Sequence, residues 1–271
     1  MGFVNRRTSW VLRRAHVVFL RRAVFRTTNH PPPDQLHSIR MLDFSRFKFI
    51  SFDCYGTLID WETGILSALH PILENHGLSL ADSDLLQLYG EVEAQAEGGE
   101  YRSYRDVLRE AGRGIGERQG FEASAAEQDS LPDSIATWKP FPDTVNALRK
   151  LHSRFQLAII SNIDDDLFAA SARQLGIEFD EVITASQARA YKPSPTIFRL
   201  AQQKLGVSTQ EWLHAGQSIY HDVIPAKSLG ISTAWVNRPS LRPGVGAVRQ
   251  ASGTPDVEVR SIQELAEVAA K

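Results

Sequence analysis

The chain has 271 residues, of which 42% are hydrophobic and 23% are charged. This length suits one large α/β domain or a core with an inserted module, and it excludes a peptide scaffold or a disulfide mini-protein. No apolar run approaches the roughly 20 residues of a membrane-spanning helix, so we expect no membrane span. The single cysteine, Cys54, excludes an intramolecular disulfide and a zinc site of several thiolates, which suits the reducing cytoplasm.

The net charge of −2 is unevenly distributed. Residues 1–40 carry eight arginines, and Asp34 is their only acid, so this part carries +7 and leaves −9 on residues 41–271. We expect residues 1–40 to be a basic, disordered leader. It would be an organelle presequence, an arm for nucleic acid or anionic membranes or, as we favour, the product of a start codon upstream of Met41. The acidic remainder has no basic patch with interleaved aromatics, so we expect no nucleic-acid binding there. A homodimer is compatible with the sequence.

Short apolar runs rich in β-forming residues alternate with stretches of helical spacing, which is the pattern of a parallel sheet. The runs are residues 47–52, 156–160, 181–184, 212–215 and 233–236. Several predicted helices end on a glycine followed by an apolar residue, a typical left-handed helix end, at Gly77, Gly176, Gly206 and Gly230. The sequence therefore predicts an α/β fold with a Rossmann-like, doubly wound parallel sheet.

The first two apolar runs are separated by about one hundred residues, whereas the later gaps have the size of ordinary βαβ units. Between Trp61 and Trp138 apolar residues recur with helical spacing. We expect residues 61–138 to form a helical cap, inserted into a core made of residues 41–60 and 139–271.

A doubly wound sheet binds its ligand outside the carboxyl ends of the strands, where the strand order reverses. Polar residues follow three of the predicted strands, and a lysine lies in the loop before the predicted helix 194–205. We expect these residues to share one cleft: Asp53, Ser161, Asn162, Lys192, Gln217, Ser218 and Asp222.

A carboxylate at a strand end, facing backbone amides, is oriented for nucleophilic attack, so we interpret Asp53 as a nucleophile rather than a turn cap. Thr57 would position it, and Lys192 would neutralise Asp53 and a bound anion. Ser161 and Asn162 would donate hydrogen bonds to a substrate carboxylate or phosphate. Asp222 has an alternative interpretation as the N-cap of the next helix.

Four segments, in order and with matching spacing, resemble the motifs of the haloacid dehalogenase (HAD) superfamily. Residues 52–60 resemble the nucleophile motif, and residues 160–162, 191–193 and 216–223 resemble the second, third and fourth motifs. The resemblance covers residues 47 to about 238 and implies a hydrolase with a HAD-like core.

Tyr55 indicates which reaction to expect. The phosphatases of the superfamily carry a second aspartate at this position, and a phenol with a pKa near ~10 replaces it poorly as a general acid. A halide leaves without a proton, and the Asp-x-Tyr-Gly-Thr-Leu form resembles the 2-haloacid dehalogenase branch. The resemblance implies that Asp53 displaces halide to give an ester. Water oriented by Asp222, with Lys192 nearby, then releases a 2-hydroxy acid without a cofactor. Tyr55, Ser161, Asn162, Gln217 and Ser218 would bind the substrate.

Two alternatives stay open. A Mg²⁺-dependent phosphatase would hold the metal through Asp53 and Asp222, and a ligand-binding protein of the same fold would have no activity. The dehalogenase branch usually carries a halide-binding arginine in the cap, which residues 89–94 lack, so Arg102 or Arg105 would have to replace it. The branch usually has a tyrosine on the helix after the third-motif lysine, where this chain has Phe198, and an asparagine in the fourth motif, where this chain has Ile219.

Three further polar features are open to interpretation. We expect His214 to be a buried core histidine and His221 to be able to contact substrate. We expect Asp164–Asp166 to be a solvated cap at the start of a helix, because carboxylates there favour the helix dipole.

Overall fold

The computed structural model describes residues 42–239, 242 and 246–271 of the chain. The predicted basic leader, residues 1–40, lies outside these described residues. None of the helices that the structure describes is long and apolar enough to cross a membrane.

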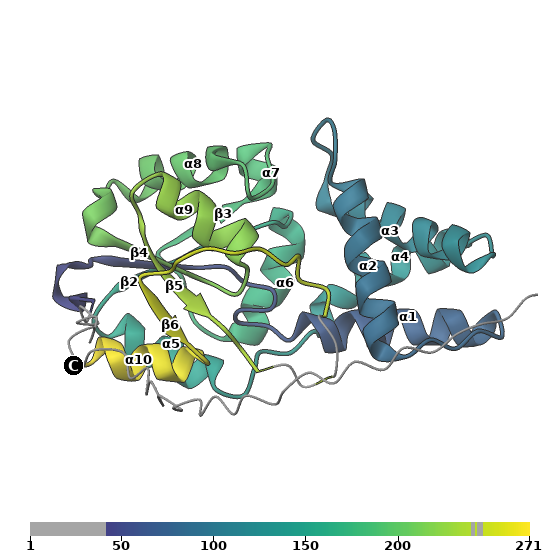
Figure 1. Ribbon diagram of the computed structural model, residues 1–271, viewed down its shortest axis with the longest axis horizontal. Coiled ribbons are helices and arrows are strands. Elements are labelled where there is room, and N and C mark those ends of the chain that lie inside the picture. Colours follow the sequence, from purple (N-terminus) through teal and green to yellow (C-terminus); the bar gives the residue numbers. More distant parts are fainter. Residues whose placement is uncertain (1–41, 240–241, 243–245) are drawn as a thin grey trace, which may run out of the picture. The chain divides into compact units, whose positions relative to one another are not determined.

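Six parallel strands form one sheet in the order β3-β2-β1-β4-β5-β6 (Figure 1). The chain places β2 and β3 on one side of the central β1, and then returns to place β4, β5 and β6 on the other side. The strand order therefore reverses between β1 and β4, which confirms the predicted doubly wound fold. The strand bounds are β1 (Phe49–Phe52), β2 (Gln156–Ser161), β3 (Glu181–Thr184), β4 (Trp212–Gly216), β5 (Ser232–Val236) and β6 (Val257–Val259).

The sequence patterns do not predict the edge strand β6. It has only three residues, Val-Glu-Val, and it pairs with the open edge of β5. So short a segment carries no periodic signal, because its strand conformation depends on the neighbour it pairs with.

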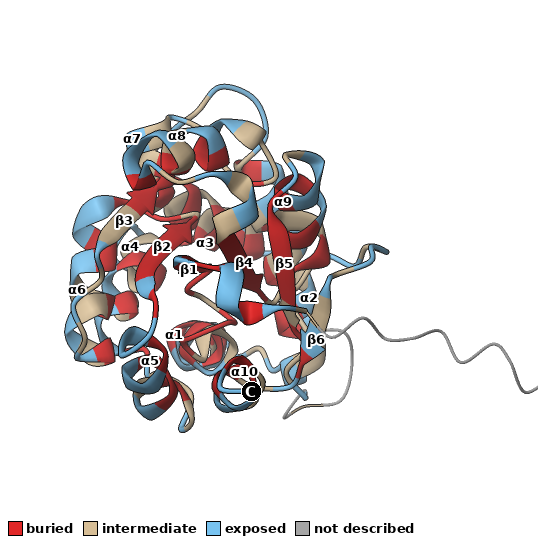
Figure 2. Ribbon diagram, turned by 90° about the vertical axis from the view of Figure 1, so that its left-hand side faces the viewer, coloured by how far each residue is buried: buried red, intermediate tan, exposed pale blue. Residues whose placement is uncertain are grey.

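Helices cover both faces of the sheet, and Figure 2 shows the buried strands between them. In β1 the side chain of Phe49 packs with the core under α8 and α9, whereas Ile50 and Phe52 belong to the core under α5, α6 and α10. Burial on both faces explains why the strands are almost continuously apolar. The helices are α5 (Thr144–His152), α6 (Asp165–Leu175), α7 (Ala185–Ala188), α8 (Pro195–Leu205), α9 (Ile224–Ser228) and α10 (Ile262–Ala269).

The first four helices after β1 stand beside the sheet in Figure 1. They are α1 (Trp61–Asn75), α2 (Asp82–Ala96), α3 (Tyr104–Gln119) and α4 (Ala125–Ser134), and we call them the helical insert. Their apolar faces pack on one another, with Leu69, Leu85 and Leu108 fully buried. Short 3-10 turns are Phe44–Arg46, Ile135–Thr137 and Thr209–Glu211.

The helix ends follow the glycine pattern. Gly77, Gly176, Gly206 and Gly230 have φ values of 70°, 60°, 63° and 75°, which is the left-handed region that glycine enters without steric cost. The predicted left-handed helix ends are confirmed.

The expectation of a solvated cap at Asp164 is wrong. Asp164 is buried, and its carboxylate accepts hydrogen bonds from the backbone N–H groups of Tyr104 and Arg105, at 3.0 and 2.9 Å. It thus caps α3 of the helical insert instead of its own helix α6. The Arg105 guanidinium also donates to Asp166 at 3.0 Å. An acid satisfies whichever unpaired helix N–H groups lie nearest, and the tertiary structure brings α3 there.

Candidate active site

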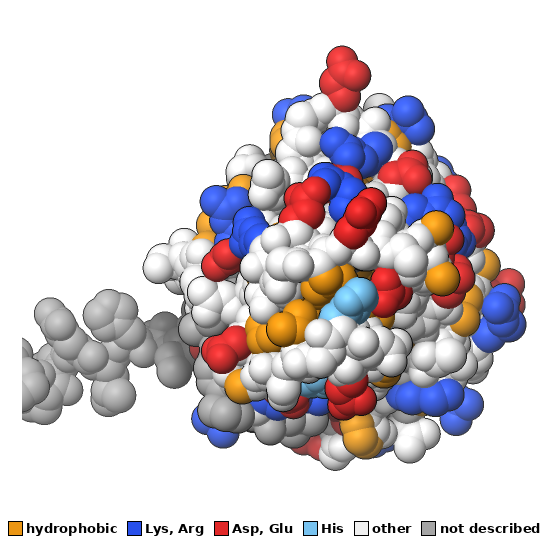
Figure 3. Space-filling model, turned by 90° about the vertical axis from the view of Figure 1, so that its right-hand side faces the viewer, with side chains coloured by type: hydrophobic (Ala, Val, Ile, Leu, Met, Phe, Trp, Pro, Cys, Tyr) orange, Lys and Arg blue, Asp and Glu red, His pale blue; other side chains and the backbone are white. Residues whose placement is uncertain are grey.

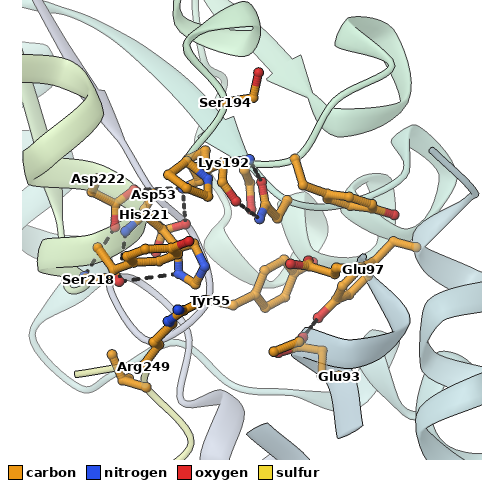
Figure 4. A pocket seen from close by; sticks show the side chains of 18 of the residues that line it. Asp53, Tyr55, Glu93, Glu97, Lys192, Ser194, Ser218, His221, Asp222 and Arg249 are labelled. Carbon is orange, nitrogen blue, oxygen red and sulfur yellow. Dashed lines mark hydrogen bonds and ion pairs between the residues drawn. The ribbon is translucent and has the colours of Figure 1, made fainter. Parts of the chain in front are cut away.

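A buried lysine bridges two buried carboxylates at the carboxyl ends of β1 and β4. The Lys192 ammonium donates to Asp53 Oδ1 at 2.8 Å, to Asp222 Oδ1 at 2.7 Å and to the carbonyl oxygen of Ile160 at 3.0 Å. Lys192 is 2% exposed and Asp222 is 1% exposed, so water screens this charge cluster weakly. The structure therefore brings together three of the residues predicted to carry the chemistry (Figure 4).

Thr57 completes the environment of Asp53. Its hydroxyl donates to Asp53 Oδ2 at 2.7 Å and accepts from the backbone N–H of Gln217 at 2.9 Å. Both carboxylate oxygens of Asp53 are thus held by hydrogen-bond donors from different segments. This arrangement fixes the side-chain rotamer and leaves the carboxylate at the floor of a cavity, as a nucleophile requires.

The charges of the cluster shift the pKa values of its members in different directions. Burial and the neighbouring Asp222 raise the pKa of Asp53 above its usual value, although Lys192 opposes this. Burial would also raise the pKa of Asp222, but the charge of Lys192 and the hydrogen bond from His214 outweigh it and lower that pKa. Asp222 is therefore the fixed counter-ion of Lys192, whereas Asp53 keeps more basicity.

Asp222 is oriented from behind by a buried chain of hydrogen bonds. The Trp212 indole N–H donates to Ser51 Oγ at 2.7 Å, and Ser51 Oγ lies 2.8 Å from Nδ1 of His214. Because the serine oxygen accepts from the indole, the serine proton can be donated to Nδ1, and Nε2 is then the nitrogen that donates toward Asp222. That nitrogen lies 3.2 Å from Asp222 Oδ1. His214 is buried with both ring nitrogens paired, as predicted.

The remaining oxygen of Asp222 is also occupied. Oδ2 accepts from the backbone N–H of Ser218 at 3.1 Å, within the turn that leads into the π-helical segment η4 (Ile219–Val223). Ser218, not Asp222, is the N-cap of this segment. Gly216 allows the close approach, because a Cβ atom there would lie 2.4 Å from the Asp222 carboxylate.

Asn162 uses both ends of its amide to hold Lys192. Its Nδ2 donates to the carbonyl oxygen of Lys192 at 3.1 Å, and its Oδ1 accepts from the backbone N–H of Lys192 at 2.7 Å. The side chain predicted to bind substrate is thus engaged in placing the lysine backbone, although it also borders the cavity. Ser161, in contrast, is buried with a hydroxyl that has no partner among the described residues. That hydroxyl is available to a ligand.

A cavity of about 490 Å³ opens above these residues, between the ends of the strands and the helical insert. All the predicted site residues except Thr57 line it. The hydroxyl of Tyr55 lies 2.7 Å from Ser171 Oγ, on α6, and burial raises the pKa of this phenol well above its usual value. Tyr55 is therefore a neutral wall residue, and a poor general acid or base.

His221 lies in the cavity next to Ser218. Its backbone N–H donates to Ser218 Oγ at 3.1 Å, and its Nδ1 lies 3.2 Å from the same oxygen. Burial lowers the pKa of His221 to about 4; Asp222 opposes this shift, and the charges of Lys192 and Arg249 add to it. The imidazole is therefore neutral at pH 7.

The helical insert contributes two acids that the sequence analysis did not single out. Glu93 accepts hydrogen bonds from the hydroxyls of Tyr89, at 3.0 Å, and Tyr104, at 2.5 Å. Glu97, the C-cap residue of α2, lines the same wall one helical turn further on. Burial and the nearby Glu93 raise the pKa of Glu97 well above its usual value, against Lys192 and Asn162. Only the i, i+4 spacing of the two acids was visible in the sequence.

The arginines at the cavity differ from those expected. Arg105 pairs with Asp133 and Asp166, and neither Arg105 nor Arg102 borders the cavity. Arg189 and Arg249, from segments outside the helical insert, line it instead. No motif in the sequence marked either residue, because each reaches the cavity from a loop.

The described residues contain no group of three or more histidines, cysteines or acids arranged to hold a metal ion. The two carboxylates considered for Mg²⁺, Asp53 and Asp222, share the ammonium of Lys192.

The doubly wound sheet, the helical insert after its first strand and the strand-end carboxylate beside a buried lysine define a hydrolase with a Rossmann-like α/β core. A family model described as haloacid dehalogenase-like hydrolase matches residues 47–230. The chain belongs to this family.

Curated relatives match most of the chain. A haloacetate dehalogenase H-2 from Moraxella sp. (strain B) is 27% identical over 220 residues, which cover 79% of this chain and 94% of the relative. An (S)-2-haloacid dehalogenase from Pseudomonas sp. (strain YL) is 27% identical over 225 residues, 82% of this chain and 94% of the relative.

Solved structures share the fold. The L-2-haloacid dehalogenase from Xanthobacter autotrophicus with chloropropionic acid covalently bound superposes with a TM-score of 0.70 at 23% identity. The match covers 83% of this chain and 98% of that structure.

Proposed function

We propose that this protein hydrolyses small 2-haloacids to 2-hydroxy acids, with Asp53 as the nucleophile. Asp53 would attack the halogen-bearing carbon from the cavity floor, which expels halide and forms an ester. Water would then attack the Asp53 carbonyl carbon of that ester, which releases the 2-hydroxy acid, restores the carboxylate and gives one proton to solvent.

The observation that carries this proposal is that the positioned carboxylate of Asp53 is followed, two residues on, by the neutral phenol of Tyr55 instead of a general acid. Lys192 and Thr57 orient Asp53. The hydroxyl of Tyr55 points to Ser171. Displacement of halide needs no proton donor, whereas an alkoxide leaving group does. The curated relatives named as dehalogenases support the same reaction.

The other residues take supporting roles in the proposal. Lys192 would compensate the negative charge of Asp53, and Asp222 would remain the counter-ion of Lys192, in both steps. Ser161, with its unpartnered buried hydroxyl, would receive a substrate oxygen. We also propose that residues 61–138 act as a cap that covers the cavity, since α2 supplies one of its walls.

The test measures halide release and phosphate release in parallel. The substrates are 2-chloropropionate, as separate enantiomers, and an aryl phosphate, each with Mg²⁺ and with EDTA. We expect halide release that survives EDTA and falls at least about 10³-fold in Asp53→Asn, the usual scale for loss of a nucleophile. Asp84→Asn, an exposed acid on α2, is the control and keeps full activity. Phosphate release that requires Mg²⁺, without halide release, would overturn the proposal.

A further inference from the structure

The cavity presents an electrostatic problem for an anionic substrate. Among the described residues, four acids line it: Asp53, Glu93, Glu97 and Asp222. The ammonium of Lys192 at its floor is already paired with two of them, Asp53 and Asp222. A haloacid carries a carboxylate, which these acids repel when they are ionised. Its capture requires positive charge that is not already paired.

Arg249 supplies one such charge. It is exposed and lines the cavity, with its guanidinium 4.2 Å from the centre of the Tyr220 ring. Figure 4 shows it on the side of Ser218 and His221, away from Glu93 and Glu97. Among the residues that the structure describes, no acid forms an ion pair with it.

The segment that carries Arg249 is held against the helical insert. The backbone N–H of Ala247 donates to Glu62 Oε1 on α1 at 3.2 Å. On α2, a Cβ atom at Gly90 would lie 2.8 Å from the carbonyl oxygen of Ala247, so glycine permits this approach. Contacts with both helices therefore place Arg249 at the cavity.

Arg189 supplies the second charge. It follows α7 with a φ of 50°, the one left-handed residue other than glycine in the described ranges. Its guanidinium lies 4.4 Å from the centre of the Tyr101 ring, and the residue is exposed while it lines the cavity. It too has no ion-pair partner in the part of the chain that the structure covers.

The arginines of α3 are held in a different way, by ion pairs. On the helical insert Arg109, Arg113 and Arg118 are each paired with nearby acids. Figure 3, which views this end of the molecule, shows basic and acidic side chains interspersed. Arg189 and Arg249 are held instead by tyrosine rings. Stacking fixes a guanidinium plane and leaves its N–H donors free for a carboxylate.

We propose that Arg189 and Arg249 select anionic substrates by attracting and binding the substrate carboxylate where the cavity opens to solvent. Both residues are exposed and line the cavity, so they stand at its opening. The halogen-bearing carbon would then be directed to Asp53 beneath them. The inference rests on the proposed function, and it assigns to these two arginines the specificity for an acid over a neutral analogue.

The test compares Arg189→Gln, Arg249→Gln and the double variant with Arg260→Gln, an exposed arginine away from the cavity. Steady-state kinetics are measured with 2-chloropropionate and with uncharged 2-chloropropionamide. We expect each cavity variant to raise the KM for the acid about 10-fold, the effect of losing one charge-assisted hydrogen bond, with kcat within about 2-fold. The preference for acid over amide falls by the same factor, and Arg260→Gln behaves as wild type.

A binding measurement separates this inference from the proposed function. Propionate and propionamide carry no leaving group, so calorimetric titration reports their affinity without turnover. Weaker propionate binding in the two variants, with propionamide binding unchanged, supports the inference even if no haloacid is hydrolysed. Unchanged propionate affinity and an unchanged acid-to-amide preference overturn it. A fall in kcat with KM unchanged also overturns it, because the arginines would then act on the reaction rather than on selection.

Discussion

Replacement of Lys192 by methionine tests the charge cluster most directly. Methionine has a similar length and fills the buried space, but it leaves Asp53 and Asp222 facing each other without the ammonium that both contact within 2.8 Å. Removing one partner of a buried ion pair costs about 3–5 kcal/mol, because an uncompensated charge remains. Both contacts are deeply buried, so we expect the unfolding free energy to fall by about that amount at pH 7.

In Lys192→Met the contribution of Asp222 to the pH dependence of stability should change sign. In the wild type the pKa of Asp222 is lowered, so its stabilising contribution is present above its unfolded pKa and lost as the pH falls. Without the lysine, both carboxylates should have raised pKa values. The folded protein then binds more protons than the unfolded chain, and the variant loses stability as the pH rises from 5 to 7.

Urea unfolding followed by tryptophan fluorescence, at pH 5 and pH 7, measures both effects. Adding Asp222→Asn to Lys192→Met removes one of the unpaired charges, so we expect the double variant to regain part of the lost stability. Lys150→Met, an exposed lysine on α5, is the control and should stay within about 0.5 kcal/mol of wild type. A loss below about 1 kcal/mol for Lys192→Met, equal at both pH values, would refute the reasoning.

Two further predictions concern stability. Burial lowers the pKa of His221 to about 4, below the unfolded value of 6.5, so the unfolded chain binds more protons in this window and stability falls as the pH decreases. Between pH 6.5 and 5 the loss is at most about 2 kcal/mol, and His221→Asn should flatten this slope in urea midpoints; an unaltered slope would contradict it. Asp164→Ala leaves two helix N–H groups of α3 without their acceptor and should cost about 1–3 kcal/mol in urea unfolding, whereas Asp164→Asn should retain part of the stability. Equal stability of the alanine variant and wild type would show that water replaces the carboxylate.

The doubly wound fold and the group around Asp53 follow from local sequence patterns. Apolar runs of strand length, separated by helices that end on glycine, leave few arrangements other than a parallel sheet covered on both faces. Polar residues directly after the strands must then meet at one edge of that sheet, whatever the details of packing. For this reason the sequence alone places Asp53, Lys192 and Asp222 together.

Only the tertiary structure decides how each polar group is used. Asp222 has both oxygens occupied by Lys192, His214 and Ser218. Asn162 holds the backbone of Lys192, because the fold brings these two loops together. Arg189 and Arg249 reach the cavity from loops whose positions depend on contacts with other elements. Local patterns report burial and conformation, whereas the choice of a hydrogen-bond or charge partner depends on which side chains meet in space.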